Sequence, residues 1–167
     1  LFGWSTHEGH SYFGVSTDTV DNYYTGRFQD WGTKQIGKDT PNTWRALTYN
    51  EWRYLLSARK NCNALMGCAQ VMGVNGLILL PDDWQAPEGV IFKPGFYEEQ
   101  INNESESKKG YGAHQFIDEV EWKKLEHAGA IFLPAAGYRI AWDVGDVQYH
   151  GFYWSSTANL ANTAYYT

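Results

Sequence analysis

Cationic side chains are scarce in this sequence, and they nowhere form a run. The 167 residues include 13 Lys and Arg against 19 Asp and Glu, which gives a formal net charge of -6 at pH 7. A surface that binds nucleic acid needs a basic stripe to face the phosphates. The composition therefore predicts no nucleic-acid partner.

Long apolar runs are absent as well. The longest, GLILL and GAIFL, are of strand length, whereas a membrane-spanning helix needs roughly 18 or more apolar residues in succession. We therefore predict no transmembrane segment in this chain. It begins with Leu1 rather than Met and shows no charged-then-apolar leader. We expect a processed or excised piece, with any lipid anchor or further domains outside it.

The sequence also lacks every strong catalytic motif. It has no G-x-S-x-G, H-E-x-x-H, Walker or dinucleotide-binding pattern. The carboxylates of Asp82 and Asp83, or of Asp143 and Asp146, offer the oxygen ligands that calcium prefers. Neither pair belongs to a D-x-D-x-D-G loop, so we favour solvated turns. We predict no catalytic residue, no metal site and no cofactor.

Cysteine is limited to Cys62 and Cys68, in the segment NCNALMGC. Their spacing is not C-x-x-C, and no His–Cys pattern with zinc-ligand spacing accompanies them. A local disulfide in an exported protein and a pair of thiols both stay open at this point. The sequence places no base beside either cysteine, which disfavours a cysteine nucleophile.

Aromatic side chains are abundant instead, at 17% of the residues, with 8 Trp and 12 Tyr. Such rings bury a large area and keep a polar tip, so they serve a core or a binding face equally well. For Trp154 we favour core packing. Many of the rings gather toward the C-terminus, together with a histidine: Tyr138, Trp142, Tyr149, His150, Tyr153, Trp154, Tyr165 and Tyr166.

Two helices are predicted from capping signals. Thr48 and Glu51 form an S/T-x-x-E capping box, which predicts a helix from about Tyr49 to Arg59. Its apolar stripe contains Trp52, Leu55 and Leu56, and Arg53 and Arg59 are expected to face outward. Asp118 and Glu121 begin the second helix, whose apolar face is Val120, Trp122, Leu125 and Ala128 and whose C-terminal cap is Gly129.

Short strands and ordered loops account for the rest. We predict irregular loops over residues 1–43, a tight turn at Asn75-Gly76 and a buried strand over residues 77–80 ended by Pro81. Residues 93–113 are the polar interval of the chain, and the run NNESESKKG within it, residues 102–110, is expected to be a solvated loop. We further predict strands at residues 131–133 and 152–157, joined by a turn at AAGYR and a hairpin or long loop. Phe152 and Trp154 should pack against the first of them. These elements define an α+β domain.

Four blocks of this sequence, met in order over residues 40–157, resemble a known family: TPNTWRALTYNEWRYLLSAR, VNGLILLPDDW, EWKKLEHAGAIFLPAAGYR and GFYWSST. They are similar to secreted and surface domains of Bacteroidetes related to the Fibrobacter succinogenes major paralogous family. That family belongs to the formylglycine-generating-enzyme-like branch of the C-type lectin fold. Some relatives are variable proteins of diversity-generating retroelements.

The resemblance implies one C-type lectin-like domain over residues 1–167, with two helices, a small twisted antiparallel sheet and long ordered loops. Relatives have further strands at both ends, which this chain lacks. It also implies export to the cell surface or the extracellular space, often as a lipoprotein. In the variable proteins the binding residues follow the YWSST-like strand, which corresponds here to Asn159, Asn162, Tyr165 and Tyr166.

The leading hypothesis is a non-enzymatic, extracytoplasmic module that binds a glycan or a protein. Its candidate ligand-binding residues lie in loops near the C-terminal third of the chain: Trp142, Tyr149, His150, Asn159, Asn162, Tyr165 and Tyr166. One alternative is an oxidoreductase similar to the formylglycine-generating enzymes that uses Cys62 and Cys68, although the late cysteine motif of those enzymes is not reproduced. Another is a purely structural module of a surface protein.

Overall fold

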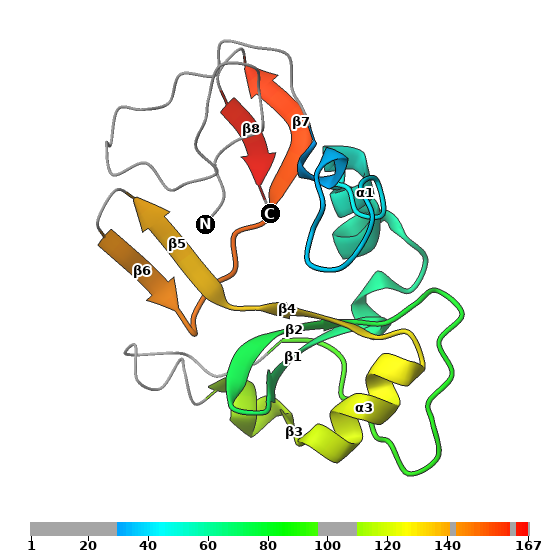
Figure 1. The fold of residues 1–167 in the computed structure, drawn as a ribbon. Coiled ribbons are helices and arrows are strands. Elements are labelled where there is room, and N and C mark those ends of the chain that lie inside the picture. Colours follow the sequence, from blue (N-terminus) through cyan, green and yellow to red (C-terminus); the bar gives the residue numbers. More distant parts are fainter. Residues whose placement is uncertain (1–29, 97–109, 141–142, 161–162, 167) are drawn as a thin grey trace. The chain divides into compact units, whose positions relative to one another are not determined.

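The computed structural model describes residues 30–96, 110–140, 143–160 and 163–166, which fall into two compact units (Figure 1). The chain passes between the units more than once, so neither is one continuous stretch. What we call the sheet unit comprises residues 53–96, 110–138 and 145–152. What we call the hairpin unit comprises residues 30–52, 139–140, 143–144, 153–160 and 163–166.

The sheet unit is built on a four-stranded sheet with the strand order β3-β1-β2-β4. Strands β1 and β2 form an antiparallel hairpin, and β4 pairs antiparallel with β2. Strand β3 runs parallel to β1, so the sheet is mixed rather than antiparallel as expected. The protein is therefore α+β, with few helices. The strand bounds are Met66–Val71 for β1, Val74–Leu79 for β2, Phe116–Ile117 for β3 and Ile131–Pro134 for β4.

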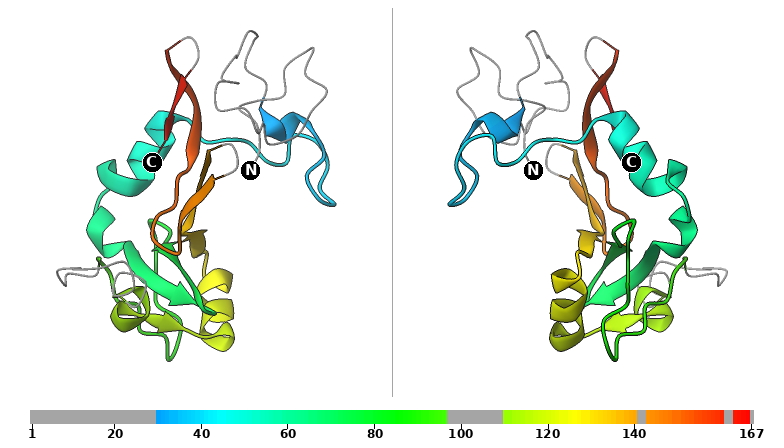
Figure 2. Two further views of the ribbon diagram at one scale, coloured as in Figure 1. Left: turned by 90° about the vertical axis from the view of Figure 1, so that its left-hand side faces the viewer. Right: turned by 90° about the vertical axis from the view of Figure 1, so that its right-hand side faces the viewer.

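Helix α3, Glu119–His127, lies against one face of this sheet (Figures 1 and 2). The side chain of Asp118 accepts a hydrogen bond of 2.8 Å from the backbone N–H of Glu121, which confirms the predicted start of the helix. Gly129 follows the helix with a φ of 89°, the left-handed conformation expected of a C-terminal cap. Leu125 is fully buried in the core, whereas the prediction that Val120 is buried was wrong, because its side chain is 67% exposed.

The main core lies between α3 and the sheet. Ile78, Leu80, Ile117 and Leu125 are almost completely buried there. Trp122 and Phe132 close the edge of this cluster with their rings in an edge-to-face contact at 5.9 Å. Alternation along β2 sends Leu77 and Leu79 to the opposite face, where Leu55 and Leu56 cover them. The sheet is thus buried on both faces.

The first predicted helix changes type along its length. Residues Tyr49–Arg53 form α1, and Tyr54–Ala58 continue as a π-helix, η2. A short 3-10 helix, η3, spans Cys62–Ala64. Arg59 closes η2 and does not face outward as predicted, because its side chain is only 2% exposed. Its guanidinium donates to the backbone carbonyls of Leu80 (2.7 Å) and Leu65 (3.1 Å), which lie just after β2 and just before β1.

The predicted turn at Asn75-Gly76 was also wrong. The chain reverses at Met72 and Gly73, which have φ values of 48° and 82°, and Asn75 and Gly76 lie inside β2. No strand was predicted where β1 lies, and its pairing with β2 fixes this register. Gly76 is needed for close packing rather than for a turn: a Cβ there would lie 2.4 Å from the carbonyl oxygen of Leu133.

Two further strands follow β4. The segment AAGYR, expected as a turn, belongs to strand β5, Ala136–Ile140, which pairs with β6, Asp143–Val147. The hairpin or long loop expected over residues 140–151 is present only in part, because this range supplies β6 while its partner β5 lies mostly before it. Residues 110–114 are helical rather than part of a loop, and residues 97–109 lie outside the described residues.

The hairpin unit contains the 3-10 helix η1, Trp31–Thr33, and the strands β7, Trp154–Leu160, and β8, Thr163–Tyr166. These two strands pair antiparallel with irregular register. Trp154 is 55% exposed, so our expectation that it packs in the core was wrong. Tyr153 is half-buried beside the ring of Trp52, and this burial raises the pKa of Tyr153 to about 12.

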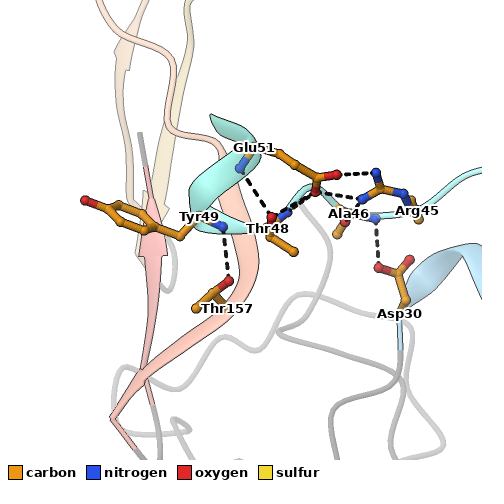
Figure 3. Close-up of polar contacts among 7 residues, drawn as sticks. All are labelled: Asp30, Arg45, Ala46, Thr48, Tyr49, Glu51 and Thr157. Atoms are coloured by element: carbon orange, nitrogen blue, oxygen red, sulfur yellow. Dashed lines mark hydrogen bonds and ion pairs between the residues drawn. The ribbon is translucent and has the colours of Figure 1, made fainter. Parts of the chain in front are cut away.

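The start of α1 is held to β7 and to the preceding loop by polar contacts (Figure 3). Glu51 and Thr48 form the predicted capping box: the Thr48 N–H donates to the Glu51 carboxylate at 2.8 Å, and the Glu51 N–H donates to the Thr48 hydroxyl at 3.3 Å. Arg45 donates to both oxygens of the same carboxylate. The Tyr49 N–H donates to the Thr157 hydroxyl at 3.0 Å, which ties the helix to β7.

No helix among the described residues is long and apolar enough to cross a membrane.

We predict that Gly76→Ala destabilises the protein by about 1–3 kcal/mol, because the new methyl group must displace neighbours that are already close-packed. It would lie 2.6 Å from the ring of Phe132 as well as against the Leu133 carbonyl. Urea unfolding measures the change. Val74→Ala in the same strand is the control, because Val74 is 39% exposed. Equal losses for the two variants would contradict the prediction.

A second prediction concerns the stability of the fold at low pH. The hydrogen bonds from Arg45, with those from Thr48, lower the pKa of Glu51 from 4.5 to about 2. A carboxylate with a lowered folded pKa stabilises the fold above its unfolded pKa, and this contribution is lost as the pH falls. Unfolding midpoints of wild type and Glu51→Gln should therefore differ by a constant amount above pH 5 and converge between about pH 4.5 and 2. A difference between the two midpoints that does not change with pH would contradict the prediction.

Candidate functional site

The best-defined functional candidate is the segment at the end of β6, which we call the 146–152 turn (Asp146 to Phe152); its first two residues are the last two of β6. Its backbone closes on itself, because the N–H groups of Tyr149 and His150 both donate to the carbonyl of Asp146 at 3.0 Å. It is also tied to β5: Gln148 donates to the carbonyl of Ala135, and Gly137 donates to the carbonyl of His150, each at 2.7 Å. The turn is thus fixed at its middle and near its end.

A buried asparagine anchors the same turn to the main sheet. Asn75 is 1% exposed, and its backbone N–H donates to the Gln148 side chain at 2.7 Å. Its side-chain amide donates to the Gln148 carbonyl at 3.0 Å and accepts from Gln70 at 2.9 Å. Tyr111 adds a fourth contact, because its hydroxyl donates to the carbonyl of Tyr149 at 2.6 Å. Partial burial raises the pKa of Tyr111, which keeps this hydroxyl a donor.

The backbone of the turn is conformationally demanding. Asp146 and Gln148 have φ values of 56° and 71°, which are uncommon for residues other than glycine. Gly137 opposite them has a φ of 69°, and a Cβ there would lie 2.1 Å from the carbonyl oxygen of Gly145. Strained backbone conformations persist only where surrounding contacts compensate for their cost, and they cluster at functional sites. The turn is therefore a candidate binding element on backbone grounds as well.

Four side chains on or beside the turn form a contiguous, partly exposed group. The carboxylate of Asp146 lies 3.4 Å from Nδ1 of His150, and the two side chains are 42% and 67% exposed. The ring of Phe152 lies 6.3 Å from that of His150 and 5.6 Å from that of Tyr138, the latter at 84°. The Tyr138 ring lies over Gly145, where a Cβ would approach it to 2.7 Å. A carboxylate, an imidazole and two rings are thus presented together by a rigid support.

The structure brings together only part of the predicted site. Tyr149 and His150 lie in the 146–152 turn. Trp142 and Asn162 lie outside the described residues. The structure describes only the backbone of the remaining three: Asn159 is in β7, and Tyr165 and Tyr166 are in β8. The first two belong to the sheet unit and the last three to the hairpin unit.

Asp146 and Phe152 were missing from the predicted ligand-binding set, and Tyr138 was noted only as an aromatic. Strand alternation predicts only the face of a strand on which a side chain lies. The contact between Tyr138 and Phe152 depends on the backbone pairing around Gly137, which alternation does not predict. Asp146 had been weighed as a calcium ligand. No group of three or more His, Cys, Asp or Glu side chains with metal-binding geometry exists within the described ranges.

The two cysteines are present as thiols rather than as a disulfide, and both are buried, at 7% and 5% exposure. The Cys62 thiol packs among apolar side chains and donates to the carbonyl of Leu55 at 3.5 Å. A reactive cysteine needs access to its substrate and a positive environment that favours the thiolate. The burial of Cys62 and Cys68 therefore gives the oxidoreductase alternative no support.

Asp82, another of the carboxylates with the oxygen ligands that calcium prefers, contacts two neighbouring side chains. The hydroxyl of Tyr54 donates to it at 2.5 Å, and the buried guanidinium of Arg59 lies 3.3 Å away. The hydrogen bond from Tyr54, with that from Arg59, lowers the pKa of Asp82. Asp82 therefore belongs to the contacts that hold η2 and the residue at its end, and we do not assign it to a ligand site.

We predict that Asn75→Ala loosens the 146–152 turn. The change leaves the carbonyl of Gln148 without the side-chain donor of Asn75, at a cost of about 1–3 kcal/mol. Hydrogen exchange should become faster at the amides of Gln148 and His150 than in the rest of the sheet unit. Asn63→Ala, on the exposed surface of η3, serves as the control and should leave exchange unchanged. Unchanged protection of the turn in Asn75→Ala would show that the anchor is not needed.

No protein-family model matches the chain, and no curated protein and no solved structure is significantly similar to it. The function is therefore argued from the geometry of the 146–152 turn and from the pattern of the sequence.

Proposed function

We propose that this protein is a non-enzymatic, extracytoplasmic module that binds a glycan or a protein through the 146–152 turn. The observation that carries the proposal is the combination of a rigid turn with exposed side chains. Asn75 fixes the backbone from beneath, while His150 and Tyr138 project at the surface. A surface that is already ordered loses little conformational entropy when it binds, which favours affinity.

The proposal includes a C-type lectin-like fold and a location at the cell surface or outside the cell. The support for both is the resemblance of the four sequence blocks, and the α+β architecture is compatible with it. Asn159, Asn162, Tyr165 and Tyr166 are proposed as contact residues on the same basis, and Trp142 is proposed because it is an aromatic residue in a predicted loop. A purely structural role is the competing proposal, and the following experiment separates the two.

A glycan array and an affinity capture from cell-surface material test the binding function with the whole chain. We expect a ligand that wild type retains and that His150→Ala loses by about three- to ten-fold in affinity, since one exposed polar contact contributes about 0.5–1.5 kcal/mol. His127→Ala is the matched control, because His127 is also exposed but lies at the end of α3. Full retention of that ligand by His150→Ala and by Tyr138→Ala would contradict binding through the turn, and the absence of any ligand for wild type would favour the structural role.

A further inference from the structure

We infer that the ligand of the 146–152 turn is a protein, and that it presents a lysine side chain to Tyr138, Phe152 and Asp146. The inference rests on the proposed binding function and chooses between the two ligand classes that it leaves open. Three features of the structure lead to it: the angle between the two rings, the state of the carboxylate and the charge of the whole chain.

The rings of Tyr138 and Phe152 are nearly perpendicular, at 84°, with their centroids 5.6 Å apart. Aromatic faces carry partial negative charge, so a cation beside two perpendicular rings is attracted by both. The ring of Tyr138 is exposed to the surface. The aliphatic stem of a lysine can also pack on these rings while its ammonium group reaches a polar neighbour. The ring pair therefore suits an organic cation with an apolar stem.

The polar neighbour is Asp146. Its carboxylate is 42% exposed and lies 3.4 Å from Nδ1 of His150, so a ligand can reach it from solvent. The carboxylate thus adds a full charge to a site whose rings already favour cations.

The charge of the chain favours a basic protein over the other ligand classes. A net charge of -6 attracts a basic partner and raises its association rate, but it does nothing for a neutral saccharide. It also opposes approach to an anionic membrane surface. A saccharide would use Asp146 only as a hydrogen-bond acceptor, whereas a lysine side chain would use the rings, the carboxylate and the long-range field together.

The test is an NMR titration of the whole chain with two small probes. Nα-acetyl-lysine N-methylamide carries the ammonium group, and Nα-acetyl-norleucine N-methylamide has the same apolar stem without it. We expect the lysine probe to shift the resonances of Tyr138 and of the 146–152 turn in a saturable way, and the norleucine probe to leave them unchanged. Equal shifts with both probes would overturn the inference, because stem packing alone would then explain binding.

Variants locate the interaction. Asp146→Asn and Tyr138→Leu should each weaken the lysine probe by about three- to ten-fold. Asparagine tolerates the left-handed backbone at position 146, so the turn is retained. Glu126→Gln removes the same charge from the exposed surface of α3 and should bind like wild type. Tyr138→Phe keeps the ring, and its full binding would show that a loss in Tyr138→Leu is due to the ring.

A set of neutral methyl glycosides separates this inference from the proposed function. If a glycoside shifts the turn, depends on Tyr138 and is indifferent to Asp146→Asn, the lysine assignment is wrong while the binding function stands. If His150→Ala abolishes capture of a ligand but the lysine probe causes no shift, the lysine assignment is again wrong while the binding function stands. If neither array, capture nor either probe finds a ligand, both proposals fail together.

Discussion

The buried amide of Asn75 is the contact on which the candidate site depends. It lies in the central hairpin of the main sheet, yet its hydrogen bonds lead to Gln148 in a turn 73 positions away. A buried polar group of this kind is costly unless all its bonds are made, so it permits only one placement of the turn. The position of His150 and its neighbours follows from that single placement.

The same logic explains the other buried polar side chain of the sheet unit. Arg59 ends η2 and donates to the carbonyls of Leu80 and Leu65, at the point where β2 has ended and β1 begins. Apolar side chains cover both faces of the sheet. Arg59 bonds beside the end of β2 and the start of β1, and Asn75 attaches the 146–152 turn to the sheet. Burial supplies most of the driving force, while the polar contacts select one arrangement.

The rigidity of the site and its chemistry come from different residues. Gly137, Asp146 and Gln148 adopt left-handed backbone conformations that shape the turn, and Tyr138 and Phe152 supply the exposed and half-buried rings. Asp146 belongs to both groups, since its backbone accepts two hydrogen bonds and its carboxylate faces His150. A binding surface of this type needs little rearrangement when its ligand arrives.

Local signals in the sequence located α3 and the start of α1 correctly. The capping box of Thr48 and Glu51 and the cap of Asp118 act between residues three apart. Both partners therefore lie within one short sequence motif. The same reasoning misplaced the turn before β2, because Asn75-Gly76 has the composition of a turn but is used for buried hydrogen bonds and close packing. It also predicted an outward Arg59, whose partners lie 6 and 21 positions away.

What the sequence determined by itself was therefore the α+β class, the helix starts, and a hairpin or loop around Tyr149 and His150. Tertiary structure decided the rest. Strand pairing with β1 set the register of β2, and long-range hydrogen bonds from Asn75 set the shape of the turn. Contacts between residues distant in the chain leave no period or spacing in the sequence, which is why Asp146 and Phe152 emerged only from the folded protein.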